Sequence, residues 1–309
     1  MSAAADPVPR GAPRSMAARM ARRFLEHWLA LASLAILVLM GLASLGAPLV
    51  ELALGVDAEA ANLFDRFAPP SAQHPLGTDE LGRDLLVRLL YGGRVSLAVG
   101  MVAAVFAAVI GTTVGILAGY FGGRLDAFLM RFTDGVIALP LLPLLIVLAA
   151  VDLEKLGLPP EVARSEDVSL YRIVVIVSLF GWTTVARLVR AETLTIRARE
   201  FVTAATAMGA GPWRIMLGHI LPNAVSPIIV ATTLSMGGII LFESVLSFLG
   251  LGIQPPVASW GNMLTNAQET IWTAPMLAVW PGLAIFVTVI AFNFLGDGLQ
   301  DALDPRAVE

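Results

Sequence analysis

The residue types that carry out chemistry in enzymes are scarce and scattered in this chain. It has no cysteine, which excludes disulfides, thiolate metal sites and cysteine nucleophiles. The three histidines, His27, His74 and His219, lie far apart and form no metal-binding pair. The lysine Lys155 lies in an acidic segment without the glycine-rich loop that binds nucleotide phosphates. The sequence therefore predicts no catalytic residue, no metal site and no cofactor in this chain.

The composition is that of a membrane protein. Of 309 residues, 57% are apolar and 14% charged, against roughly a quarter charged in a soluble domain, which excludes a water-soluble enzyme. Apolar runs long enough to cross a bilayer as helices lie at 28–50, 95–118, 126–150, 170–189, 222–249 and 276–298. These runs are continuous, unlike the alternating strands of a membrane β-barrel. We predict an all-α polytopic membrane protein with six transmembrane helices.

The arginines predict its orientation, because short cytoplasmic loops retain Lys and Arg. Arginine-rich segments precede the first run and fill residues 187–219, whereas 152–169 is acidic and 250–275 has no basic residue. Both termini are therefore expected in the cytoplasm. The predicted divisions are a tail at 1–27, a first span at 28–50, an outer loop at 51–94, a core at 95–298 with a cytoplasmic loop at 190–221, and a tail at 299–309.

The first apolar run has a second interpretation. An arginine-rich start before an apolar stretch also resembles a secretory signal, with small residues at 42–47 as a cleavage site. Because the run has about 20 apolar residues, longer than the apolar region of a signal peptide, an uncleaved helix is favoured. The proline-bearing tail before Arg19 is expected to be unstructured.

Three carboxylates lie within or at the edges of the predicted spans. Counting along the helices at 1.5 Å per residue places Glu243 near the outer boundary and Asp297 at the inner surface, whereas Asp134 lies roughly 12 Å deep in the third span. Charged groups at such depth are costly unless paired or near water. Asp134 is therefore either a pathway residue or a structural one, bonded to a neighbouring helix or paired with Arg131 one turn earlier.

Small residues mark two further features. Gly111, Gly115 and Gly119 recur every four residues in the second span, a spacing that lets another helix approach closely. In the inner loop, an alanine-rich segment at 200–208 ends in glycine and is followed by a second short helix near Pro212. We expect this pair of helices to insert into the groove of a partner protein, with Phe201, Val202 and Met208 as anchors. The alternative, a helix lying on the lipid surface, requires more apolar area than Ala, Thr and Gly provide.

At this loop the chain resembles the permease subunits of ATP-binding-cassette importers. Their cytoplasmic loop carries the EAA motif, E-A-A-x-x-x-G followed by I-x-L-P. Thr203, Ala204, Ala205 and Gly209 match its first half with Thr in place of Glu, and Glu200 stands one turn earlier as a substitute for that charge. Ile220, Leu221 and Pro222 are similar to the second half without its spacer.

Further blocks resemble the second, C-type permease of dipeptide and oligopeptide importers. They are the stretch from His74 to Asp84, the stretch from Glu243 to Gly261 and the tail from Phe292 to Arg306. The resemblance implies a type I importer permease fold and a heteromeric importer in a bacterial or archaeal cytoplasmic membrane. It also implies that ATP and Mg bind to partner ATPase subunits, so this chain is not an enzyme.

The resemblance implies partners on both sides of the membrane and within it. A second unlike permease, two ATPases, an outer solute-binding protein and membrane lipids are expected, and no nucleic acid. The ATPase-coupling residues would be Glu200, Phe201, Val202, Thr203, Ala204, Ala205, Met208, Gly209, Ile220, Leu221 and Pro222. The residues of the outer loops toward the binding protein would be Asp79, Arg83, Asp84 and Trp260.

Alternatives remain for the cargo and for the functional class of the protein. Peptides are the expected cargo, while nickel chelates, glutathione and oligosaccharides are carried by relatives of the same group. A secondary transporter driven by an ion gradient would show broken helices in two matching halves; Pro227 is the one suggestive break, and no repeat is visible. A membrane scaffold without transport is the third class.

Overall fold

The computed structural model describes residues 16–303, apart from 156, 158 and 164. In this part of the chain the regular structure is helical, with one isolated antiparallel bridge between Thr78 and Asp84. The helices are α1 (Met16–Glu26), α2 (Trp28–Leu45), α3 (Ala47–Leu54), η1 (Leu63–Asp65), α4 (Leu85–Phe121), α5 (Gly123–Ala138), α6 (Leu141–Ala149), α7 (Pro160–Ala163), α8 (Glu166–Arg197), α9 (Glu200–Ala207), α10 (Pro212–Ile215), η2 (Met216–Ile220), α11 (Leu221–Phe248), η3 (Asn262–Leu264), α12 (Ala267–Thr270) and α13 (Met276–Leu303).

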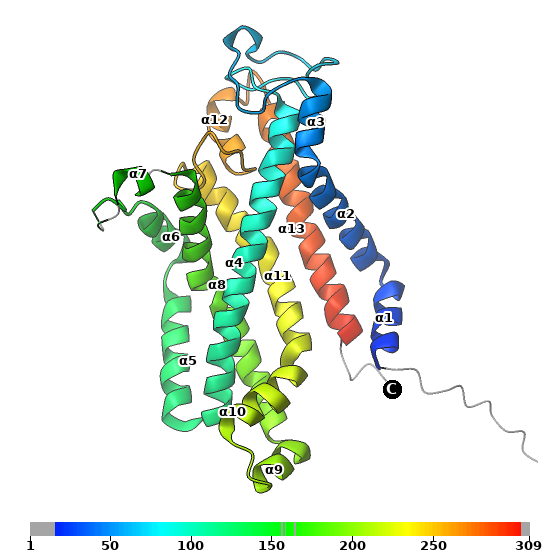
Figure 1. Cartoon of the computed structure of the whole chain (residues 1–309), viewed down its shortest axis with the longest axis vertical. Coiled ribbons are helices and arrows are strands. Elements are labelled where there is room, and N and C mark those ends of the chain that lie inside the picture. The colour runs from blue at the N-terminus through cyan, green and yellow to red at the C-terminus, as the bar shows by residue number, and fades with distance from the viewer. Residues whose placement is uncertain (1–15, 156, 158, 164, 304–309) are drawn as a thin grey trace, which may run out of the picture.

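The long helices run side by side in an elongated bundle with two distinct ends (Figure 1). We call the end that carries α9 and α10 the loop end. The opposite end, the cap end, carries the cap, which we define as residues 55–84 and 250–275. The described ends of the chain, α1 and the last turn of α13, lie together at the loop end, where His27 Nε2 is 3.5 Å from the carboxylate of Asp301. Because both described ends of the chain lie at the same end of the bundle, the chain crosses the membrane an even number of times.

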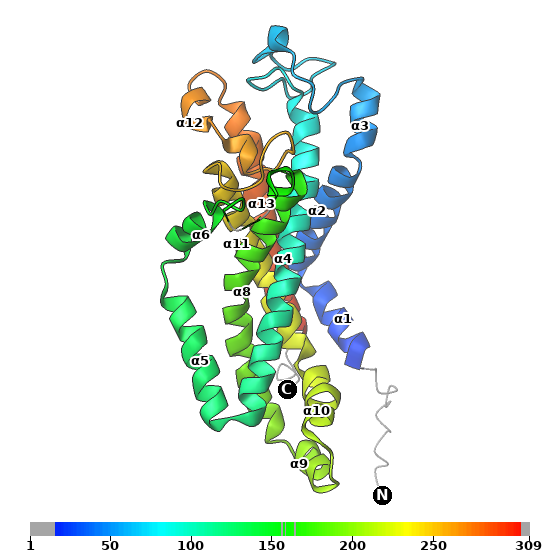
Figure 2. The same cartoon turned by 60° about the vertical axis from the view of Figure 1, so that its left-hand side comes forward.

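Within the described residues, five helices are long and apolar enough to cross a membrane, and the number is six if the bent pair α5 and α6 forms one span. The prediction of a single third span at 126–150 is wrong in one respect, because α5 and α6 meet at 84° (Figure 2). Pro140 causes the break: it has no N–H for the helix, and its ring drives the preceding residue out of the helical region. Leu139 accordingly has the extended ψ of 139°.

Several predicted boundaries differ from the observed helices. The second span begins at Leu85 instead of residue 95, so the turn of the cap feeds one 37-residue helix. The fourth span continues through Arg197, which places Arg187 and Arg190 inside α8 and not in the inner loop. Within the predicted N-terminal tail, residues from Met16 onward form α1, and residues 1–15 lie outside the described part of the chain.

The glycines of the second span bring α4 and α8 into close contact, as predicted. A Cβ atom added at Gly111 would lie 2.6 Å from the carbonyl oxygen of Trp182, and one at Gly119 would lie 2.7 Å from Thr193 Cβ. At these distances no side chain fits. This is the most extensive helix contact of the described chain.

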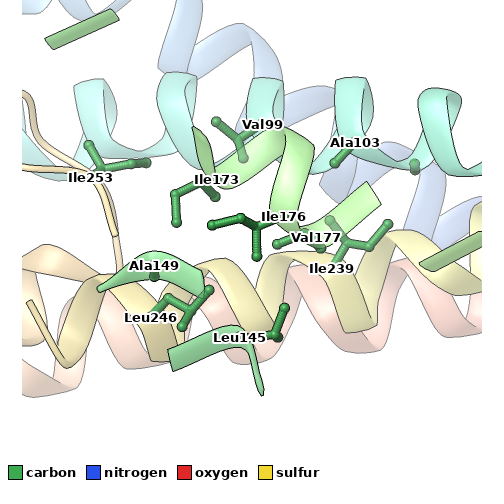
Figure 3. Packing of buried hydrophobic residues seen from close by; sticks show 11 residues of the cluster. Val99, Ala103, Leu145, Ala149, Ile173, Ile176, Val177, Ile239, Leu246 and Ile253 are labelled. Carbon is green, nitrogen blue, oxygen red and sulfur yellow. The ribbon is translucent and has the colours of Figure 1, made fainter. Parts of the chain in front are cut away.

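An apolar core fills the space between the upper parts of α4, α6, α8 and α11 (Figure 3). Val99 and Ala103 of α4 contribute to it together with Ile176 of α8 and Leu246 of α11. Leu145 and Ala149 of α6 are buried in the same core, so the short helix after the break is anchored to the bundle.

The first long helix is part of the fold. α2 packs against α13, and the approach is so close that a Cβ on Gly298 would lie 2.2 Å from the Cβ of Ala30. His27 caps α2 by accepting the backbone N–H of Ala30. This packing supports the uncleaved helix over the cleaved signal.

Candidate functional site

The segment at the loop end is a short helix, a glycine turn and a second helical start. Gly209 ends α9 with a φ of +85°, and its N–H and that of Ala210 donate to the carbonyls of Thr206 and Ala205. This is the hydrogen-bond pattern of a glycine helix stop, and Pro212 opens α10 as predicted. The second helix is not a separate short one, since α10 runs through the π-helix η2 into α11.

One face of this segment is packed against the bundle. Val202 and Ala205 are buried, and Val202 packs in one cluster with Ile215, Met216 and Ile220 over the loop ends of α4 and α8. The prediction that Val202 is available as an anchor for a partner is therefore wrong. Its side chain already holds the segment to its own bundle, as does that of Ile220, and Ala205 is buried as well.

The opposite face is exposed. Met208 is 82% exposed, and Phe201, Trp213 and Leu217 are also large exposed apolar residues. The remaining predicted coupling residues Glu200, Thr203, Ala204, Gly209 and Pro222 are exposed, and Leu221 is half-buried. Trp213 and Leu217 are not among the residues predicted from the sequence to contact a partner. A tryptophan directly after a glycine turn is a signal that could have indicated such a contact. A cavity of about 690 Å³ lies beside this face, between α9 and the end of α4.

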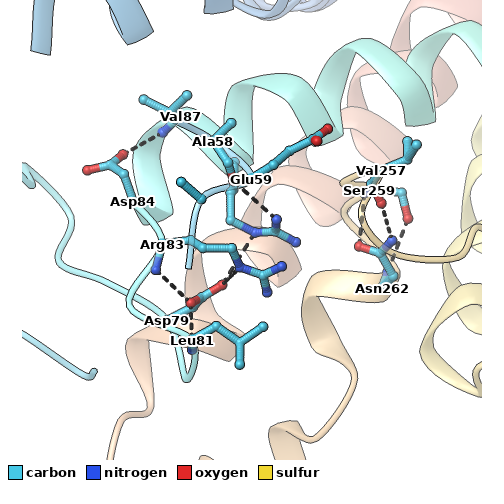
Figure 4. A network of polar contacts seen from close by, with 12 residues as sticks. Ala58, Glu59, Asp79, Leu81, Arg83, Asp84, Val87, Val257, Ser259 and Asn262 are labelled. Carbon is cyan, nitrogen blue, oxygen red and sulfur yellow. Dashed lines mark hydrogen bonds and ion pairs between the residues drawn. The ribbon is translucent and has the colours of Figure 1, made fainter. Parts of the chain in front are cut away.

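At the cap end, two arginines converge on one carboxylate (Figure 4). Asp79 Oδ2 is 2.8 Å from Arg83 Nε and 3.4 Å from Arg88 Nε. Its Oδ1 accepts the backbone N–H groups of Leu81 and Arg83. All three charged side chains are buried, so the cluster fixes the turn that leads into α4.

Asp84 begins α4. Its carboxylate accepts the N–H of Val87 at 2.7 Å, which is an N-cap interaction. Its other oxygen is 3.0 Å from Nδ1 of His74. The turn requires glycine at Gly82, where φ is +75° and a Cβ would collide with the carbonyl of Asn62.

The second part of the cap is pinned to α4 by Trp260. Its indole Nε1–H donates to the carbonyl of Leu89 at 2.9 Å, and its ring covers Gly93, where a Cβ would lie 2.8 Å from the indole. Asn262 holds the preceding loop by donating to the carbonyl of Val257 (Figure 4) and to that of Ile253.

The predicted contact residues of the outer loops are thus structural. Asp79, Arg83, Asp84 and Trp260 are each at most 8% exposed, so their side chains are engaged inside the cap. The exposed apolar side chains of the cap are others: Phe64 is 100% exposed and Trp272 91%.

Glu243 lies at the cap end of α11, as the depth count predicted, and is fully buried. Ser247 and Ser96 donate to its two carboxylate oxygens at 2.7 and 3.0 Å. Ser96 also accepts the N–H of Trp260, and Ser247 that of Ile253. The carboxylate therefore ties α4, α11 and the second part of the cap together.

Asp134 pairs with an arginine of another helix. Its Oδ1 is 2.5 Å from Nη2 of Arg187 on α8, so the pairing with Arg131 is wrong, and the bond to a neighbouring helix is correct. Arg187 lines a cavity of about 680 Å³ between α5, α6, α8 and α11. The carboxylate thus sits at the edge of this cavity while holding two helices together.

These features define a class: a multi-pass α-helical membrane protein with a buried polar cap at one end and a partly exposed helical loop at the other. The chain belongs to the family of binding-protein-dependent transport system inner membrane components, whose model matches residues 111–309. A second model, the N-terminal TM domain of oligopeptide transport permease C, matches residues 15–70.

Curated relatives align with nearly the whole chain. The glutathione transport system permease protein GsiD of Pectobacterium atrosepticum is 42% identical over 92% of this chain and 89% of the relative. The oligopeptide transport system permease protein OppC of Bacillus subtilis is 37% identical over 92% and 88%. The dipeptide transport system permease protein DppC of Alkalihalophilus pseudofirmus is 39% identical over 91% and 87%.

Proposed function

We propose that this chain is the C-type permease of an ATP-driven importer that moves peptides across the cytoplasmic membrane. The observation that carries the proposal is the similarity over about nine tenths of the chain to permeases of dipeptide, oligopeptide and glutathione systems. Glutathione is itself a tripeptide, so these relatives share one class of cargo.

The loop end faces the cytoplasm in this proposal and receives the ATPases. The arginines of residues 197–214 support that orientation through the positive-inside rule. The contact surface consists of the exposed face of α9 and the start of α10, with Met208 and Trp213 as the large apolar groups. ATP and Mg bind to the partner subunits, and this chain carries out no covalent chemistry.

The buried face of α9 and the following turn transmits movement of the ATPases to the transmembrane helices. Val202 and Ile220 are packed against the loop ends of α4, α8 and α11, so a displacement of α9 moves these helices with it. Closing and opening of the two ATPases around ATP then alternates the access of the pathway between the two sides of the membrane.

The cap faces outward and meets the solute-binding protein. Its buried ion pairs keep the cap rigid, while exposed groups such as Trp272 provide the contact. A second, unlike permease subunit completes the pathway across the membrane, with lipid around both.

The assembly test uses the tagged full chain co-expressed with the ATPase, permease and binding-protein genes next to its own. We expect the two ATPases and the second permease to co-purify, and ATP hydrolysis in liposomes to rise when the peptide-loaded binding protein is added. A chain that purifies without ATPase and takes up solute on an ion gradient alone would contradict the proposal and support a secondary transporter.

A further inference from the structure

The cavity beside Asp134 combines apolar walls with one charge. Its volume of about 680 Å³ lies within the range of pockets for small ligands. Among the described residues that line it, Arg187 is the single ionisable side chain. Two of the hydroxyl groups of the lining, those of Thr183 and Ser235, donate to carbonyls of their own helices. Arg187 is therefore the principal polar group available to a ligand there.

The ion pair lies far from the ends of α5 and α8, near mid-membrane depth, and its side chains are open to the outside of the chain. Asp134 is roughly 17 Å along α5 from its first residue, and Arg187 roughly 15 Å from the end of α8, which is about half the thickness of a bilayer core. Their side chains are 57% and 50% exposed. Charged groups at such depth face a polar cavity or a pathway, because lipid does not solvate them.

A neighbouring ion pair on the same two helices is less exposed. Arg190 contacts both carboxylate oxygens of Asp126 through Nε and Nη2, at 2.5 and 2.6 Å. It does not line the cavity. Arg187 contacts Asp134 through one nitrogen, which leaves further N–H donors of its guanidinium. The Asp126–Arg190 pair is therefore a structural ion pair, whereas Arg187 of the other pair keeps N–H groups that can donate to a ligand.

We propose that Arg187 binds the free carboxylate of the peptide during its passage, with Asp134 as the residue that positions the guanidinium. This inference rests on the proposed function. Dipeptides, longer peptides and glutathione differ in length and side chains, but each ends in a free carboxylate. An arginine that binds this shared group among apolar walls, which tolerate varied side chains, suits a passage of broad specificity.

The test compares dialanine with its C-terminal amide in liposomes that contain the complete importer and a saturating binding protein. In Arg187→Gln, uptake of dialanine is expected to fall about tenfold relative to uptake of the amide, because a hydrogen bond between charged groups is lost. Arg190→Gln is the matched control, and it should leave the ratio unchanged. The binding protein is identical in all samples, so its own preference cancels between variants.

A second variant separates the binding role of Arg187 from its structural role. It is read from dialanine uptake alone, so it tests the proposal even if the wild-type importer does not carry the amide. Exchanging the charges, Asp134→Arg with Arg187→Asp, restores the ion pair but removes the cation from the cavity lining. The proposal predicts normal assembly with dialanine uptake still low. Full recovery of uptake, or an equal loss for both substrates in Arg187→Gln, would overturn it. A wild-type importer that assembles and carries no peptide would contradict the proposed function, and this inference with it.

Discussion

Gly115 of α4 lies directly against the backbone of Ala186 on α8. A Cβ added at Gly115 would be 2.7 Å from the carbonyl oxygen of Ala186 and 2.8 Å from Val189 Cβ, so the two backbones touch where other residues would hold them apart. The contact continues one turn away on both sides, at Gly111 and Gly119. The α4–α8 pair therefore has little tolerance for added volume along three successive turns.

Gly115→Leu should prevent normal packing of the bundle. Overpacking a close contact typically costs about 1–3 kcal/mol or more, and here the obstacle is backbone, which cannot turn aside. We expect a large loss of folded protein, measured as the monodisperse fraction after detergent extraction. Gly41→Leu, at a helical glycine with open space around it, is the control. Equal yields of the two variants would contradict the packing account.

The coupling surface can be tested without damaging the chain. Met208→Glu places a charge on a side chain that is 82% exposed, so folding should be unaffected while co-purification of the ATPases falls. Leu63→Glu, an exposed apolar residue of the cap, should retain the ATPases. If Met208→Glu retained normal ATPase binding and transport, the docking surface would lie elsewhere.

A bulky residue at Ala205 is expected to act differently. Ala205 lies on the buried face of α9, so Ala205→Trp should detach the segment from its own bundle and lower thermal stability even without partners. The melting temperature of the isolated chain distinguishes the two effects: it should fall for Ala205→Trp and stay constant for Met208→Glu.

The cap should depend on the charge of Asp79. Asp79→Asn keeps the shape of the side chain but leaves Arg83 and Arg88 buried without their carboxylate, and breaking a buried pair costs roughly 3–5 kcal/mol. We expect a clearly lower melting temperature. Glu59→Gln changes an exposed carboxylate of the cap and should have little effect. A thermally unchanged Asp79→Asn would show that the cluster does not hold the cap.

The cavity can be filled from one position. Gly238 lines it, and a Cβ there meets no atom within 4 Å, so Gly238→Trp should fold, assemble and hydrolyse ATP while peptide uptake is blocked. Gly282→Trp, at a glycine of α13 with similar open space outside the cavity, should transport normally. Undiminished uptake in Gly238→Trp would exclude this cavity from the pathway.

Features that depend on local spacing could be predicted from the sequence. The apolar runs, the glycine stripe at 111–119 and the glycine stop at Gly209 each follow from residues within a few turns of one another. The break at Pro140 has a local signal too, namely the proline itself, but the high apolar content on both sides of it favours a single span over 126–150.

Features that depend on which helices face each other could not be predicted. Asp134 and Arg187 are 53 positions apart, and nothing local selects Arg187 over Arg131. Residue type alone predicts a contact surface for the polar cluster of the cap, because it does not reveal that two arginines fold inward onto Asp79. The cavity likewise arises only when α5, α6, α8 and α11 are assembled.

ATP-driven peptide import can be measured as uptake of labelled peptides by liposomes that contain this chain, its second permease and both ATPases. We expect uptake that requires internal ATP and the external binding protein, and that stops when ATP is replaced by a non-hydrolysable analogue. Assembly with ATP hydrolysis but uptake of nickel chelates or oligosaccharides instead of any peptide would contradict the peptide assignment. Uptake without ATP would contradict the importer itself.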